Sequence, residues 1–154
     1  MELIVAGSMR RGSSNYDKPE WISVDNLSYK KYINKLANRH VKTERKKGNI
    51  YSVKEVLDKI HRAFLSTNGI DPLDGIPMES SLISICKIVE SGQLIGHEKV
   101  LRRLPTVAVD TNEKKREFIV ISNQSLKAKG EMNVVEFIQY CTGIADYQRN
   151  KLSQ

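Results

Sequence analysis

The sequence predicts an α+β fold, with a helical N-terminal part followed by a strand–turn–strand–helix unit. Three observations support this prediction. Apolar residues recur at helical spacing from residue 28 to residue 89, the pattern changes to short β-rich runs at residue 104, and helical spacing returns after residue 133. We therefore expect one α+β domain over residues 28–147, an irregular arm over 1–27 and a C-terminal tail over 148–154.

The bulk composition is typical of one globular domain. The chain has 154 residues, of which 40% are apolar and 28% are charged. No apolar run approaches the roughly 20 residues that span a bilayer, and the first apolar stretch is too short for a signal peptide. We expect a cytoplasmic protein without a membrane partner. Gly7-Ser8-Met9 is typical of a cloning junction, so we expect the native sequence to begin at Met9.

The first predicted helix, residues 28–47, carries the net charge of the chain. Ser28 is its expected N-cap, and Gly48-Asn49 is expected to end it. Eight basic residues occupy the side of this helix that carries no apolar residues. The segment contains one acidic residue, Glu44. The resulting charge of +7 equals the net charge of the whole chain, so the basic excess is local.

A local basic excess is typical of a surface that meets a polyanion. We therefore expect a nucleic-acid partner, DNA rather than RNA, with two lysines of a later loop as further phosphate contacts. The alternative is a solvated helix face without a ligand. The expected contact residues are Lys30, Lys31, Lys35, Arg39, Lys42, Arg45, Lys46, Lys47, Lys127 and Lys129.

A second helix is predicted over residues 53–66. Ser52 and Glu55 have the spacing of a capping box, in which the side chain of each residue bonds to the backbone of the other. His61 adjoins the apolar stripe of this helix, and we expect a partly buried structural histidine rather than a ligand.

Residues 68–77 form a cluster of turn-forming residues that contains Asp71 and Asp74. The other oxygen ligands of a calcium loop are missing at the required spacing, so we expect a structural turn. A mostly buried short helix is predicted over residues 82–89, ending at Gly92.

From residue 104 the periodicity is that of strands. The runs 106–109 and 118–121 predict a β-hairpin connected through 110–115. A helix capped by Asn133 is expected to follow. Its expected apolar face consists of Val134, Val135, Phe137, Ile138 and Cys141. Cys86 and Cys141 are expected to be buried thiols rather than disulfide partners or half of a zinc site.

The order strand, turn, strand, loop, helix over residues 104–137 is that of the metal-binding core of HNH endonucleases. Further matching features are spread along the chain. They are the basic helix with Gly48-Asn49, the turn Asn68-Gly69-Ile70-Asp71-Pro72, Leu104-Pro105-Thr106-Val107, Ala128-Lys129 and Glu136-Phe137-Ile138. On these features the chain resembles a group of small bacterial HNH endonuclease-related proteins, often of unassigned function. The resemblance covers most of residues 28–147 and implies an HNH-like ββα unit over 104–147.

The chain departs from that family where the chemistry is expected. The resemblance implies Asp-His directly after Leu-Pro-Thr-Val, and an asparagine three residues before the matching lysine. This sequence has Ala108 and Val109 at the first place and Leu126 at the second. Neither alanine nor valine can act as a general base or a metal ligand. We therefore expect a degenerate nuclease scaffold without efficient phosphodiester hydrolysis, without a metal site and without a cofactor.

Two alternatives remain open at this point. A catalytic site could be rebuilt from Asp110, His97 and Asn123, with Lys129 as a further candidate, giving an active HNH-type endonuclease that uses magnesium or a similar divalent metal. In the other alternative, the chain is a non-enzymatic protein-interaction subunit. The principal hypothesis is a nucleic-acid-binding protein.

Overall fold

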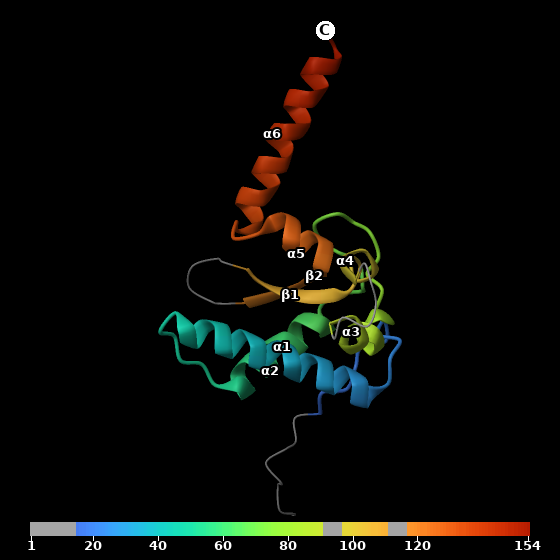
Figure 1. The fold of residues 1–154 in the computed structure, drawn as a ribbon, viewed down its shortest axis with the longest axis vertical. Coiled ribbons are helices and arrows are strands. Elements are labelled where there is room, and N and C mark those ends of the chain that lie inside the picture. Colours follow the sequence, from blue (N-terminus) through green and yellow to red (C-terminus); the bar gives the residue numbers. More distant parts are fainter. Residues whose placement is uncertain (1–14, 91–96, 111–116) are drawn as a thin grey trace, which may run out of the picture.

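The structure is a computed structural model that describes residues 15–90, 97–110 and 117–154, without the side chains of 87–90 and 97–98. Figure 1 shows the β-hairpin between two helical layers, with the first two helices on one side and α5 on the other. The elements are α1 (Asn26–Lys46), α2 (Val53–Leu65), α3 (Leu82–Glu90), α4 (His97–Val100), β1 (Pro105–Asp110), β2 (Glu117–Ser122), α5 (Asn123–Lys129) and α6 (Val134–Leu152). Helices and a two-stranded antiparallel sheet together confirm the predicted α+β class.

Helix α1 forms where the sequence predicted it, although it begins earlier. Its N-cap is Asp25 rather than Ser28, and the Asp25 carboxylate accepts the Ser28 amide at 2.7 Å. Its apolar positions are buried at helical spacing against α2 and α3. They are Tyr29, Tyr32, Ile33, Leu36, Ala37 and Val41.

The segment before α1 is anchored to the core by Trp21 and Ile22. The Trp21 ring stacks on Phe64 of α2 with centroids 5.8 Å apart, and its Nε1 donates to the Phe64 carbonyl at 3.1 Å. Ile22 is fully buried. The predicted arm therefore has a fixed C-terminal part, while residues 1–14 lie outside the described chain.

Helix α2 also matches its prediction, and His61 is a structural residue. Its Nδ1 lies 2.8 Å from the Tyr29 hydroxyl of α1, so the two rings join the helices. Burial lowers the pKa of His61, and the negative charges of Asp17 and Asp58 oppose that shift. In the described chain, Ser52 stands at the N-cap without the side-chain bond that the capping box requires.

The predicted hairpin is confirmed. β1 and β2 pair antiparallel from Pro105↔Ser122 to Asp110↔Glu117. Because side chains alternate along a strand, the hairpin has two different faces. The face toward the α1–α2 core carries Val107, Val109, Phe118 and Val120. The opposite face carries Thr106, Ala108, Ile119 and Ile121, and α5 contacts both strands. The predicted connection lies largely outside the described residues.

The helices after the hairpin differ from the prediction. α5 follows β2 directly, where a loop was expected, because its polar sequence has no apolar periodicity to reveal it. α6 has the predicted Asn133 cap, completed by Glu136, but buries none of its residues. It projects away from the hairpin (Figure 1), so the helix that packs beside the strands is α5. The helix after Asn133 buries none of its residues, so the predicted HNH-like ββα unit over 104–147 is not confirmed.

Two smaller predictions also need correction. α6 runs to Leu152, so most of the expected tail is helical. Cys141 is exposed rather than buried, whereas Cys86 is buried as predicted. The predicted end of α3 at Gly92 lies outside the described residues, within which α3 extends to Glu90. Among the described helices, none combines the length and the apolar character needed to cross a bilayer.

Candidate nucleic-acid interface

The exposed side of α1 carries a row of basic residues. The helix has 21 residues, which corresponds to a length of about 30 Å at 1.5 Å per residue. Its buried face is fixed by the two tyrosines and the aliphatic residues, so the basic residues between them point outward. We call this surface the basic face, and it consists of Lys31, Lys35, Arg39, Lys42, Arg45 and Lys46.

The one acidic residue within α1 does not weaken this surface. Glu44 is buried, and its carboxylate accepts hydrogen bonds from the Asn49 amide at 2.9 Å and the Lys47 ammonium at 3.3 Å. Lys47 is thereby paired with an acid, and Lys30 lies 3.7 Å from Asp17. The basic face as defined here leaves out these two lysines.

A groove borders the N-terminal half of the basic face. It lies between α1 and α3 and has a volume of about 540 Å³. Its ammonium and side-chain amide groups can donate hydrogen bonds to phosphate oxygens, whereas the hydroxyls of Ser28 and Ser84 already donate to Asp25 and to the Ser81 carbonyl. Lys35 reaches toward the groove floor, with Nζ 3.9 Å from Cys86 Sγ. The lining residues are Ser28, Lys31, Tyr32, Asn34, Lys35, Ile83, Ser84 and Cys86.

The two later lysines of the prediction lie on α5, on the other side of the hairpin (Figure 1). Lys129 is buried, and its ammonium donates to the carbonyls of Met132 at 2.6 Å and Gly130 at 3.3 Å. It ties down the end of α5 and is not the exposed loop lysine that we expected. Lys127 is exposed and belongs to a separate cavity of about 400 Å³, lined by Lys99, Arg102, Asn123, Gln124 and Lys127.

The three residues that the resemblance places at the reactive positions of an HNH core have packing roles in this structure. Ala108 and Val109 are neighbours on β1 but point to opposite faces of the hairpin. Ala108 is buried opposite Ile119, and Val109 packs against the α1–α2 core. Leu126 is half-buried on α5. At these three positions the apolar side chains fill space.

The structure does not bring the substitute catalytic residues together. Asp110 pairs with Glu117 at the turn end of the hairpin. Asn123 lies at the other end, where its backbone N–H donates to the Leu104 carbonyl at 2.9 Å. Six strand residues at about 3.3 Å each separate the two ends by roughly 20 Å. A single site containing both Asp110 and Asn123 is therefore not formed.

His97 opens α4, but its side chain lies outside the described part of the chain. Lys129, the remaining catalytic candidate, is engaged with the two carbonyls at the end of α5. Within the described ranges, no group of three or more histidine, cysteine, aspartate or glutamate side chains is arranged to hold a metal ion.

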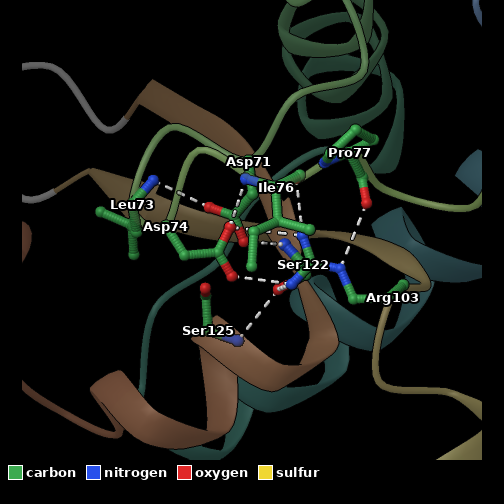
Figure 2. Close-up of polar contacts among 8 residues, drawn as sticks. All are labelled: Asp71, Leu73, Asp74, Ile76, Pro77, Arg103, Ser122 and Ser125. Carbon is green, nitrogen blue, oxygen red and sulfur yellow. Dashed lines mark hydrogen bonds and ion pairs between the residues drawn. The ribbon is translucent and has the colours of Figure 1, made fainter.

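A buried polar network that the sequence did not predict lies between the 68–77 turn and the hairpin (Figure 2). Asp71 is fully buried, and its carboxylate accepts the backbone amides of Leu73 at 2.8 Å and Ser122 at 2.9 Å. Burial alone would raise the pKa of Asp71. Hydrogen bonds from the side chains of Ser122 and Ser125 and from those amides outweigh burial and hold the pKa below its usual range.

Arg103 completes the network from the other side. It donates to both oxygens of Asp74, to the Ser122 hydroxyl and to the carbonyls of Ile76 and Pro77. These five contacts match the five N–H groups of a guanidinium. The network therefore acts as a structural clasp. Asp71 and Asp74 could be recognised as turn residues from the sequence, but the distant Arg103 gave no local signal.

Comparison with known proteins adds no relative to this description. A scan against protein-family models, a search of curated proteins and a search of solved structures all returned no match. The resemblance to HNH endonuclease-related proteins therefore rests on the sequence features quoted above. The charge and geometry of α1 are independent of that resemblance.

Proposed function

We propose that the protein binds nucleic acid through the basic face of α1, without strong preference for base sequence. The observation that carries this proposal is the row of lysines and arginines along that face. Six basic side chains share one side of a helix about 30 Å long, whose only acid is buried. Duplex DNA carries one negative charge per 1.7 Å or so of its axis, and neutralising its phosphates releases bound counterions.

The groove beside α3 supports the same proposal. Phosphate contacts commonly combine lysine or arginine with hydroxyl and amide donors. Here Lys31 and Lys35 are accompanied by the side-chain amide of Asn34 around one hollow. A backbone phosphate at this place would be held by hydrogen bonds as well as by charge. Such contacts position a nucleic acid but carry no sequence information.

We further infer that the nucleic acid is bound rather than cleaved. Hydrolysis of a phosphodiester needs a group that activates water and a centre that offsets developing charge. Ala108, Val109 and Leu126 offer neither chemistry. Their packing against the core and α5 supports a scaffold whose catalytic positions now serve stability.

The test compares two double charge reversals that change net charge equally. Arg39→Glu with Lys42→Glu alters the basic face, and Lys54→Glu with Arg62→Glu alters exposed positions of α2. Fluorescence anisotropy with random-sequence duplex DNA and RNA should show at least a tenfold loss of affinity for the first variant only. If neither variant, or both equally, lost affinity at low salt, the basic face would be an ordinary solvated surface.

A further inference from the structure

The cavity beside α5 has an entirely polar lining. It lies between the start of α5 and the segment that includes the end of α4, and its volume is about 400 Å³. Among the described residues that line it, three are cationic, two carry side-chain amides, and none is acidic or apolar. They are Lys99, Arg102, Asn123, Gln124 and Lys127. Pockets for most small molecules are lined mainly by apolar side chains, so this lining suits a small polar anion instead.

The backbone fixes the two walls of this cavity relative to each other. The carbonyls of Arg102 and Leu104 accept the backbone N–H groups of Gln124 and Asn123, both at 2.9 Å. The carbonyl between them accepts the backbone N–H of Glu79 at 2.8 Å. Because the two N–H groups of α5 are engaged in this way, a ligand in the cavity would be held by side chains. Walls that are already in place lower the ordering cost of binding.

The charged side chains supply donors that match a phosphate group. Within the described ranges, the side chains of Lys99 and Arg102 make no ion pair, in contrast to Arg103, which is paired with Asp74. Lys127 adds a third positive charge to the same lining. Like charges around one hollow repel each other, and an anion between them relieves that repulsion. A guanidinium can bind phosphate through two parallel N–H bonds, while ammonium and amide groups add single donors.

We propose that this cavity binds a phosphate monoester, either on a small molecule or at the end of a nucleic-acid strand. A monoester carries close to two negative charges at neutral pH, because its second pKa is about 6. A phosphodiester of a nucleic-acid backbone carries only one. Three cationic side chains around one hollow therefore favour the monoester. The cavity lies on the other side of the hairpin from the basic face (Figure 1), so either site can exist without the other.

Titration of the ¹⁵N-labelled full chain with methyl phosphate tests the site. At about pH 7.5, where the monoester is mostly doubly charged, and at constant ionic strength, the backbone amide shifts should saturate. They should be largest over residues 99–102 and 123–127. Dimethyl phosphate has the single charge of a phosphodiester and should bind roughly fivefold more weakly or worse. Equal affinities, shifts that do not saturate, or shifts spread evenly over the basic face would overturn the proposal.

A matched pair of variants separates this site from the basic face. Lys99→Gln with Arg102→Gln should weaken methyl phosphate binding about tenfold. Arg39→Gln with Lys42→Gln removes the same charge from α1 and should leave that binding unchanged. Duplex DNA without terminal phosphates should show the reverse pattern, so failure of one site is distinguishable from failure of the other. Fluorescence of Trp21, which stacks on Phe64, reports whether each variant stays folded. Unchanged methyl phosphate binding in the first variant, or an equal loss in both, would overturn the proposal.

Competition with oligonucleotides identifies the source of the monoester. A single strand with a 5′-phosphate that displaces methyl phosphate better than the same strand with a 5′-hydroxyl would assign the site to nucleic-acid ends. Equal displacement by the two strands would assign it to a small phosphorylated molecule.

Discussion

Arg103 and Asp74 form a two-point ion pair, with Nη1 2.7 Å from Oδ2 and Nη2 3.3 Å from Oδ1. The pair joins residues 29 positions apart and is mostly shielded from solvent. Because Arg103 also donates to the Ile76 and Pro77 carbonyls, one side chain fixes the whole turn against the start of β1. This arrangement sets the position of the hairpin relative to the helical layer.

Replacing Arg103 with lysine should destabilise the protein by about 2–3 kcal/mol, although the charge is kept. Lysine has three donors at one point and cannot reproduce the planar fork that reaches Asp74, Ile76 and Ser122 together. The control is Arg102→Lys at the neighbouring exposed position, which should cost less than about 0.5 kcal/mol. Urea unfolding measures both. Equal effects at Arg102 and Arg103 would contradict the clasp.

The buried carboxylate of Asp71 should make the free energy of unfolding depend on pH in the acidic range. Its pKa is lower in the folded protein than in the unfolded chain, whose ordinary value is about 3.9. The stabilisation is therefore present above pH 4 or so and is lost as pH falls through the folded-state value. Asp71→Asn should be less stable at neutral pH and should flatten this acid limb. Asp146→Asn, at an exposed position of α6, should retain it. An unchanged acid limb in Asp71→Asn would refute this assignment.

His61 should produce a second pH dependence, closer to neutrality. Burial lowers its pKa in the folded protein below the ordinary value of about 6.5. Neutral imidazole is therefore the folded form, and its contribution is present above pH 6.5 or so and is lost as pH falls through the lower folded-state value. His61→Gln, whose amide can still bond to Tyr29, should remove this slope. Unfolding free energies between pH 5 and pH 7 check it, and a slope that persisted would contradict the prediction.

Strong periodicity made the first two helices and the hairpin predictable, because burial of one face determines them. The α1 positions from Tyr29 to Val41 and the paired strand runs of the hairpin show this clearly. α5 escaped prediction because Asn123–Lys129 is polar and is specified by the Ser122 cap and contacts to both strands. The apolar residues of α6 recur at helical spacing, which predicted a buried face, but the structure buries none of them. Helical spacing does not show which surface, if any, covers a helix.

The basic face was predictable in outline, since charge clusters are visible in sequence. Which lysines pair with Asp17 or Glu44 depends on contacts with other segments, and only the structure shows them. Lys129 illustrates the same point, because its burial follows from the fold of α5 and the turn after it. The clasp of Arg103 could not be predicted, because its partners are far away in sequence.

Gly69 should tolerate no side chain. It adopts a φ of +88°, and a Cβ there would lie 2.9 Å from Cε3 of Trp21. Gly69→Ala therefore combines backbone strain with displacement of the ring that anchors the arm, and should cost about 2–3 kcal/mol. Gly75 is the control, because its φ is +70° but a Cβ would meet no described atom within 4 Å. Gly75→Ala should cost only about 1 kcal/mol. Equal costs would show that Trp21 yields easily.

The slope of the salt dependence of nucleic-acid binding should report the number of phosphates that the basic face neutralises. The logarithm of the binding constant falls with the logarithm of salt concentration by about 0.9 for each phosphate neutralised on duplex DNA. Six basic side chains therefore set an upper slope near −5, and we expect a value between about −3 and −5. Lys42→Gln should reduce the slope by about 1, because it removes one exposed contact from the middle of the face. Lys54→Gln on α2 should leave the slope unchanged. Anisotropy titrations from low to physiological salt measure both variants, and a slope near zero in the unaltered protein would show that the basic face does not contact phosphates.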